Sequence, residues 1–183
     1  MKVIPVILLV LSLTACMSPV RRMPALPTAA NDAYRLGSGD TLQITVFAET
    51  DLSGNFRVSD GGTISMPLVG AVPAEGATLD ELRQRLTTQL KANAIRDPNV
   101  TLAVVEYRPF FILGEVKNPG SYPFVPHMTV LTAVAIAGGF TFRASQDEIS
   151  VTRPSTNGSL VASAKRESRI QPGDVVYVFE RHL

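Results

Sequence analysis

The side chains of this chain that could perform acid–base or metal chemistry are few and poorly placed for either. A glycosidase needs two carboxylates that converge on one bond, but Asp147 and Glu148 are adjacent, so they face opposite sides of an extended chain. The chain has 2 histidines, His127 and His182, and 1 cysteine, a composition that disfavours a metal cluster. It contains neither a dinucleotide-binding glycine loop nor a Gly-x-Ser-x-Gly nucleophile motif. We therefore expect a non-catalytic protein that holds no metal and no cofactor.

A Gly-Asp pair occurs twice in similar surroundings. Residues 35–46 read RLGSGDTLQITV and residues 169–178 read RIQPGDVVYV: a basic residue, an aliphatic residue, two turn residues, Gly-Asp and a β-rich run. We expect Gly39 and Gly173 to supply unusual backbone angles, and Asp40 and Asp174 to bond nearby backbone amides. The repeat therefore predicts a turn that starts a strand in two places, and not a binding site.

Composition bounds the size and the partners of the fold. The chain has 183 residues, enough for one large or two small domains, and 45% of them are apolar. The formal net charge is +1, so no global charge steers the protein onto nucleic acid. With 13 glycines and 13 prolines, we expect many turns.

The N-terminus has the order of a secretory signal. Met1-Lys2 precedes an apolar run over 3–13 that is too short to cross a bilayer. Leu13-Thr14-Ala15-Cys16 resembles the bacterial lipoprotein cleavage box, which implies that Cys16 becomes an acylated first residue and the membrane anchor. An ordinary cleaved signal with an accidental cysteine is the alternative. We expect a signal peptide at 1–15 and a lipid-anchored, proline-containing linker at 16–33.

The first of two expected units begins with strands. Apolar and polar residues alternate over 41–47, as in a half-buried strand. Asp60-Gly61-Gly62 suits a tight turn, so we expect residues 56–58 and 63–66 to pair as a hairpin. A further strand is expected at 100–106.

One long helix completes this unit. Thr78 and Glu81 form a capping box, from which a helix should run to about Ala94. Its apolar stripe consists of Leu79, Leu82, Leu86 and Leu90.

The second unit reads as two strands, a helix and two strands. We expect strands at 110–116 and 121–125, joined by a type II turn with Gly120 at its third position. Thr129 should cap a short helix to Ala137 that is buried all round and closed by Gly138-Gly139. Two more strands are expected at 149–152 and 175–179. The fold class is α+β, with a β-grasp-like sheet over one helix.

Sequence stretches in both units resemble one family. YRLGSGDTLQITVF, LSGNFRVSDGGTISMPLVG, the TLDEL helix start and RDPNVTL resemble the N-terminal domain of the bacterial polysaccharide export (outer-membrane polysaccharide exporter) family. RPFFILGEVKNPGSYPF followed by MTVLTAVAIAGGF resembles that family's soluble-ligand-binding β-grasp (SLBB) domain. The resemblance places an export domain at 34–106 and an SLBB domain with the final strand at 107–183.

The resemblance implies export of a polymer and not catalysis. Members of the family are lipoproteins that form rings in the envelope and pass capsular polysaccharide or exopolysaccharide outward. We therefore expect an outer-membrane lipoprotein that faces the periplasm. Its implied partners are the polysaccharide, further copies of itself in a ring, and an inner-membrane polysaccharide co-polymerase or chain-length regulator. Nucleic acid is not expected.

The chain departs from the larger members of the family in two places. It ends at Arg181-His182-Leu183 directly after the final expected strand, with one β-grasp unit and without their C-terminal pore helix. We therefore expect a separate outer-membrane pore protein, to which this chain acts as a ring or adaptor. His127 stands before Met128 where we expect glycine, so the turn there should differ in detail.

Two groups of side chains are candidate glycan contacts. The first group, on the expected hairpin, is Lys117, Asn118 and Tyr122, and the second, on a basic loop, is Lys165, Arg166 and Arg169. A solvated turn and an ordinary exposed loop are the alternatives. A periplasmic glycan hydrolase or lyase is the alternative function, and a purely structural lipoprotein is a third. Only an enzyme would shorten the polymer on incubation.

Overall fold

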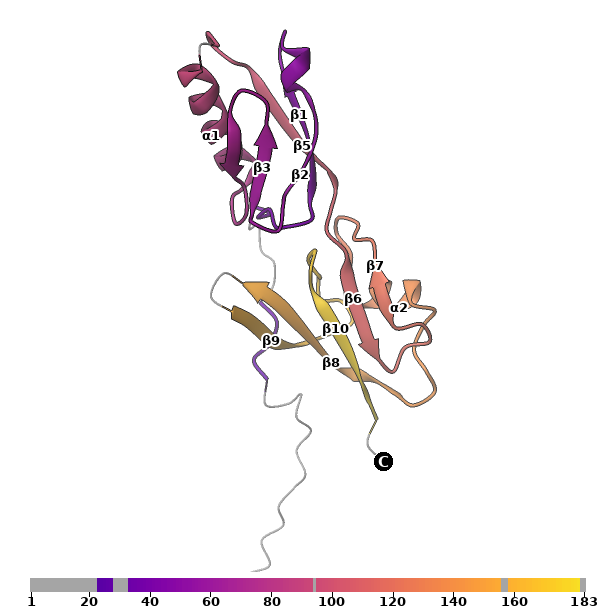
Figure 1. Ribbon diagram of the computed structural model, residues 1–183. Coiled ribbons are helices and arrows are strands. Elements are labelled where there is room, and N and C mark those ends of the chain that lie inside the picture. Colours follow the sequence, from indigo (N-terminus) through magenta and orange to yellow (C-terminus); the bar gives the residue numbers. More distant parts are fainter. Residues whose placement is uncertain (1–22, 28–32, 94, 156–157, 182–183) are drawn as a thin grey trace, which may run out of the picture.

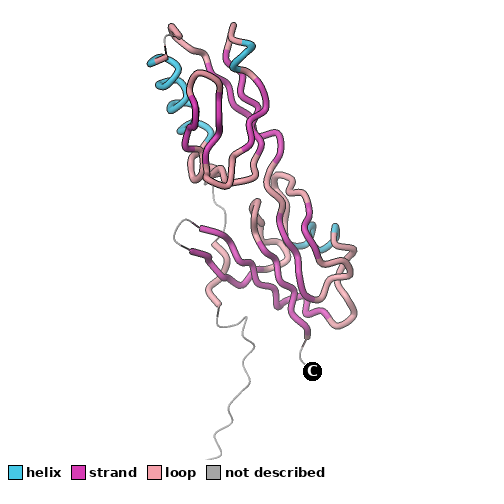
Figure 2. Tube along the Cα trace, in the orientation of Figure 1, coloured by secondary structure: helices cyan, strands magenta, loops and turns pink. Residues whose placement is uncertain are grey.

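The computed structural model describes residues 23–27, 33–93, 95–155 and 158–181. The fold class is α+β, as expected, and the chain forms two units with separate hydrophobic cores (Figure 1). Strands dominate both units, and loops connect them (Figure 2). Within the described residues, no helix has the length and apolar character needed to cross a membrane. The expected signal peptide and Cys16 lie outside the described residues.

The first unit is a three-stranded antiparallel sheet with a hairpin and a helix. The sheet has the order β2-β1-β5. The strands of the unit are β1 (Thr41–Val46), β2 (Gly54–Arg57), β3 (Thr63–Met66), β4 (Gly70–Pro73) and β5 (Val100–Glu106). A 3₁₀ turn, η2, covers Thr50–Leu52, and the helix α1 covers Leu79–Ala92.

The expected hairpin of 56–58 and 63–66 is wrong. A tight turn does form, because the Gly62 N–H donates to the Ser59 oxygen and Gly62 has a φ of 72°. The segments on its two sides then diverge: β2 pairs with β1, whereas β3 pairs with β4. The reason is that the N–H of Val58, after β2, donates to the Asp40 oxygen, which draws this end of β2 towards β1.

The helix α1 confirms its sequence signals. The Thr78 side chain accepts from the Glu81 N–H, and the Glu81 carboxylate accepts from the Thr78 N–H, which is a complete capping box. Leu82, Leu86 and Leu90 are fully buried against the sheet.

The second unit is a five-stranded sheet with one short helix. Its strands are β6 (Phe110–Gly114), β7 (Gly120–Tyr122), β8 (Ala144–Ser155), β9 (Gly158–Ala164) and β10 (Val175–Glu180), in the order β7-β6-β10-β8-β9. Only the β10–β6 pair is parallel. Four strands were expected in this unit, and β9 was not among them, because its small residues give a weak strand pattern.

The helix α2 (Val130–Ile136) is half-exposed, so the expectation of burial all round is wrong. Val130, Ala133 and Val134 face the core, but Leu131 and Ile136 are 48% and 47% exposed. The helix therefore packs one side against the core of this unit and exposes the other. Gly138 and Gly139 follow it with φ values of 86° and 94°.

Two turns differ from the expected glycine chemistry. Gly120 does not have a positive φ, so the type II turn is wrong: Gly120 pairs with Ile112 as the first residue of β7, which requires extended backbone. The chain instead turns over 115–119, after Gly114, the last residue of β6, whose φ is 86°. His127, which stands where glycine was expected, has a φ of 66°. The histidine therefore adopts the left-handed conformation that glycine would favour.

Part of the expected linker lies along the second unit. The Leu26 N–H donates to the Ser163 oxygen, and the Ser163 N–H donates to the Pro24 oxygen. These bonds add Pro24–Leu26 as a short extension at the free edge of β9, and Leu26 packs against the core of this unit. The chain therefore covers the outer edge of β9 with its own N-terminal segment.

Candidate functional site at the junction of the two units

The first Gly-Asp turn buries a carboxylate at the end of the first unit. Gly39 has a φ of 97°, and Asp40 is completely buried. The Asp40 carboxylate accepts from the Gly37 N–H at 2.8 Å and from the Tyr34 hydroxyl at 2.5 Å. It also accepts from Arg108, through the backbone N–H at 2.8 Å and the guanidinium at 3.1 Å. Four donors thus satisfy one buried anion, as a buried charge requires.

The second Gly-Asp turn repeats this arrangement. Gly173 has a φ of 84°, and Asp174 is completely buried. Its carboxylate accepts from the Gln171 N–H at 2.8 Å. Arg153 binds it through two nitrogens, at 2.9 Å and 2.8 Å, which is the bidentate geometry that makes arginine–carboxylate pairs strong.

The backbone bonds of the two turns also correspond. The Asp40 oxygen accepts from the Val58 N–H, and the Asp174 oxygen accepts from the Phe111 N–H. The aliphatic residue of each motif donates to the backbone oxygen of the residue that precedes a helix N-cap. The Leu36 N–H donates to the Ala77 oxygen, before the cap of α1, and the Ile170 N–H donates to the Met128 oxygen, before the cap of α2. Each copy of the motif therefore joins a helix start to a strand start within its own unit.

Arg108 connects the two turns. Besides its bonds to Asp40, its guanidinium donates to the Tyr34 hydroxyl at 2.9 Å and lies 5.8 Å from the centre of the Tyr34 ring. Among the described residues, Asp40 is the single carboxylate that pairs with it. A Cβ added to Gly173 would lie 2.8 Å from the Arg108 Nε, and one added to Gly37 would overlap the same guanidinium. Only glycine leaves room for Arg108 at these two places. This side chain thus lies between the first unit and the final turn of the second.

Aromatic rings continue from this contact across the junction. Tyr107 packs edge-on against Tyr34 at 5.2 Å and against Phe124 at 5.6 Å. Burial, followed by the hydrogen bond to Asp40, raises the pKa of the Tyr34 hydroxyl well above its usual value. This hydroxyl therefore stays protonated and remains a donor to Asp40.

A groove opens beside the aromatic rings. Its volume is about 650 Å³, and three prolines contribute to its walls. Its other lining residues include Val105, Glu106, Tyr107, Tyr122, Phe124 and Val125. The residues come from the end of β5, the connection between the units, and β7 with the loop after it. Apolar walls with a few polar groups are typical of ligand sites.

The structure places one residue of the first group of candidate glycan contacts in the groove and the other two outside its lining. Tyr122 lines the groove, stacks on Phe110 at 6.0 Å and donates its hydroxyl to the Asn118 oxygen. Lys117 and Asn118 instead lie against the C-terminal end of α2, where their N–H groups donate to Gly139 and Ala137. Of these three residues, only Tyr122 belongs to the groove.

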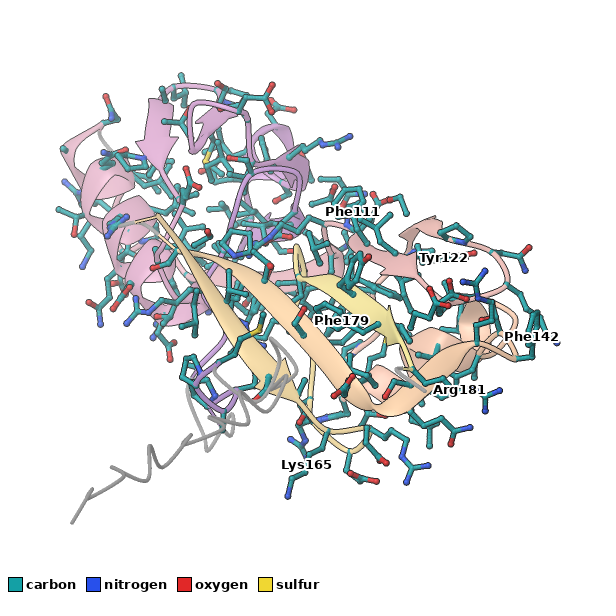
Figure 3. The ribbon with its side chains drawn as sticks, turned by 90° about the horizontal axis from the view of Figure 1, so that it is seen from below. Phe111, Tyr122, Phe142, Lys165, Phe179 and Arg181 are labelled. Atoms are coloured by element: carbon teal, nitrogen blue, oxygen red, sulfur yellow. The ribbon has the colours of Figure 1, made fainter. Side chains whose placement is uncertain are left out.

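The basic loop lies away from the groove. The Arg166 backbone oxygen accepts from the Leu131 N–H, and the backbone of Arg169 forms an isolated antiparallel β-bridge with Thr129. Arg166 and Arg169 therefore flank the start of α2. Lys165 is exposed, and Figure 3 shows it well apart from Tyr122. The second group therefore does not share a site with the first.

Sequence reasoning missed the residues that build the junction. Arg108, Arg153, Tyr107 and Phe124 were not singled out. The signal that could have found Arg108 is its place beside Pro109 at the start of the second unit, where a charged residue interrupts two apolar strands. Within the described residues, no three histidine, cysteine or acidic side chains gather to hold a metal ion.

The chain matches two domain families in the order of its units. Residues 28–105 match the family described as polysaccharide biosynthesis/export protein. Residues 109–162 match the SLBB domain. The boundary between the two matches contains Tyr107 and Arg108, which lie at the junction.

Curated proteins similar to this chain include the following three. The EPS I polysaccharide export outer membrane protein EpsA of Ralstonia solanacearum is 32% identical over 78% of this chain and 45% of its own length. The exopolysaccharide production protein ExoF of Rhizobium meliloti is 37% identical over 61% of this chain and 29% of its own. The polysialic acid transport protein KpsD of Escherichia coli is 29% identical over 60% of this chain and 20% of its own length. The chain thus spans less than half the length of these relatives.

The glycines of the repeated turn should matter through backbone geometry. A Cβ at positive φ costs about 1 kcal/mol or more, and at Gly173 it also meets Arg108. Gly39→Val and Gly173→Val should each lower the melting temperature of the full chain by about 3 °C or more. Gly61→Val is the control, because Gly61 lacks a positive φ and its nearest neighbour lies at 3.8 Å. Unchanged melting in both turn variants, measured by circular dichroism, would contradict the geometric role.

Proposed function

We propose, from the matches of residues 28–105 to the polysaccharide biosynthesis/export family and of residues 109–162 to the SLBB domain, that this chain is a non-catalytic component of an export system for capsular polysaccharide or exopolysaccharide. The names of its relatives support this class of polymer, since they refer to exopolysaccharide and polysialic acid. The single observation that suggests where the polymer binds is the aromatic groove at the junction of the units.

The groove has the chemistry of a sugar contact. A pyranose ring has an apolar face of C–H groups and a rim of hydroxyls. Tyr107, Tyr122 and Phe124 offer aromatic surface for the apolar face. Glu106 offers an acceptor for hydroxyls at the edge of the groove. The groove is open, which suits contact with a passing polymer and not enclosure of a small molecule.

The acidic side chains of the groove support a non-catalytic role. A glycosidase uses two carboxylates on opposite sides of the scissile bond. Among the residues that line the groove, Glu106 is the single carboxylate. The two buried carboxylates, Asp40 and Asp174, already accept from arginines and backbone amides.

Deleting this protein from its host should remove polysaccharide from the cell surface while synthesis inside the cell continues. Complementation with Tyr122→Leu should restore less surface polymer than the wild type. The leucine keeps apolar packing on Phe110 but removes the aromatic face, so the affinity of the purified protein for the exported polymer should fall about two- to tenfold. The measurements are surface polymer by immunoassay and affinity by calorimetry.

Two variants serve as controls for this test. Tyr122→Phe keeps the ring and should bind like the wild type. Phe142→Leu removes an aromatic residue that is 83% exposed and lies outside the groove, and it should also bind like the wild type. Normal surface polymer in the deletion strain would refute the export role. Equal losses in all three variants would refute the groove as the contact.

We also propose that the protein is held at the outer membrane by a lipid on Cys16 and faces the periplasm. The name of the Ralstonia relative supports the outer-membrane location. Cys16→Ser should shift the protein from the outer-membrane fraction to the soluble periplasmic fraction, because a lipid anchor depends on its acyl chains. Flotation of the variant with the outer membrane in a strain without partner proteins would show another attachment.

We propose further that the protein works as a ring or adaptor between an inner-membrane polysaccharide co-polymerase or chain-length regulator and a separate outer-membrane pore protein. This assignment follows the resemblance to family members that form rings in the envelope. The purified full chain should give no stable channels across a planar lipid bilayer, whereas the complete export complex should conduct. Reproducible channels from this protein alone would contradict a separate pore.

A further inference from the structure

The edge strands of the two larger sheets differ in their length and in whether another segment of the chain covers them. In the second unit, Pro24–Leu26 covers the edge of β9, and the opposite edge strand, β7, has 3 residues. In the first unit, β5 has 7 residues, and its pairing partner among the described residues is β1. The edge of β5 is therefore the longest strand edge without a covering segment in the part of the chain that the structure describes.

The sequence of β5 does not protect this edge. Val100–Glu106 reads VTLAVVE, with no proline, no lysine and a single charge at its last position. Val105 is 49% exposed. Native proteins normally blunt an exposed edge with charges, proline or a bulge, because unpaired N–H and C=O groups attract another strand. In β5 the ladder with β1 has one bulge-like irregularity, at Val105, and the residues before it, Val100–Val104, keep a regular register. An edge of this kind is typical of a surface that is paired in the assembled protein.

The free hydrogen-bonding groups of β5 belong to alternate residues. The Phe47 N–H donates to the Asn99 oxygen, which sets the phase of the ladder between β1 and β5. In an antiparallel ladder the residues bonded to the neighbouring strand alternate with residues whose groups point away from it. The outward groups are therefore those of Val100, Leu102 and Val104. They form a regular row that a second strand can bond.

The two outer edges of this sheet carry opposite charges at the same level. Arg57 ends β2 and Glu106 ends β5, and both pair with Thr41 of the central strand. Both side chains are exposed. Neither belongs to an ion pair within the described residues. Because β2 and β5 are both antiparallel to β1, they also run in the same direction.

We propose that the β5 edge of one copy of this chain pairs with the β2 edge of the next copy. Copies related by rotation about an axis along the strands keep the same level, so Glu106 of one copy meets Arg57 of its neighbour. This head-to-tail contact uses a different surface on each side, and such contacts form a ring when the rotation between successive copies closes. The inference rests on the proposed export ring and identifies the surface that builds it.

The charges favour this contact over a two-fold pairing of β5 with itself. In an antiparallel β5–β5 pair centred on Leu102, Glu106 would lie opposite Pro98 of the other copy, and Arg57 would take no part. The head-to-tail contact places both charges against an opposite charge and covers both edges of the sheet. In a closed ring, this three-stranded sheet would have no exposed edge, as in a barrel.

Charge reversal tests the contact directly. Glu106→Arg alone and Arg57→Glu alone each place like charges together, so each should weaken association of the full chain in detergent by about tenfold or more. The double variant restores opposite charges and should restore association to near the wild-type level. Sedimentation velocity measures the assembly, and melting temperature shows that each variant is folded. A monomeric wild type, or single variants that assemble like the wild type, would overturn the inference.

A third variant separates the possible partners of β5. Ala103→Lys adds a charge on an exposed position of β5 and should also reduce assembly. Gln84→Lys, on the exposed side of α1, is the control with the same charge change. Loss of assembly in Ala103→Lys without any effect of the two reversals would indicate β5 pairing with itself, and it would overturn the head-to-tail contact.

The export role can fail or hold independently of this contact. If the deletion strain keeps its surface polymer but the reversed charges rescue each other, the export role is wrong and the edge contact is correct. If deletion abolishes surface polymer but the reversals leave assembly unchanged, the export role holds and the edge contact is wrong.

Discussion

The arrangement of the two units depends on the buried carboxylate of Asp40 and its contact with Arg108. Asp40 has no exposed surface, and its charge is balanced by a guanidinium that is 25% exposed. A buried carboxylate is costly unless it is paired and hydrogen-bonded, and removing one partner of such a pair typically costs about 3–5 kcal/mol. Arg108 comes at the start of the second unit, 68 positions after Asp40. The requirement to satisfy one anion therefore fixes where the second unit begins relative to the first.

The same Gly-Asp turn with a buried carboxylate occurs in both units, but the arginine that pairs with the carboxylate comes from a different place in each. Asp40 and Asp174 each accept from an amide three residues earlier and from an arginine. Arg153, the partner of Asp174, lies on the adjacent strand β8 of its own sheet, so that pair stabilises a single unit. Arg108 reaches from the connection to the first unit and also lies against Gly173. One copy of the turn is thus internal, and the other joins the units.

The junction, the groove and the strand edge form one continuous region. Tyr107 packs against Tyr34 and also lines the groove. Because the Tyr34 hydroxyl is bonded to Asp40, the contacts of Asp40 also help to fix the shape of the groove. Glu106 lines the groove and ends β5. In the proposed ring, the contact between copies and the proposed sugar contact therefore lie side by side. Assembly would then set how many grooves face the polymer and where they lie.

The sequence by itself determined the local elements, and the tertiary structure decided which of them meet. The capping box at Thr78 and the strand at 41–46 follow from spacing alone, because each depends on neighbours within a few residues. The hairpin of 56–58 and 63–66 was predicted wrongly, because a turn limits but does not choose the partners of its flanking strands. The strand β9 and the Arg108–Asp40 contact were missed for a related reason: small residues carry a weak pattern, and nothing near Arg108 in the sequence indicates its partner. Long-range pairing is chosen by burial and charge balance over the whole fold, and only the folded chain brings those groups together.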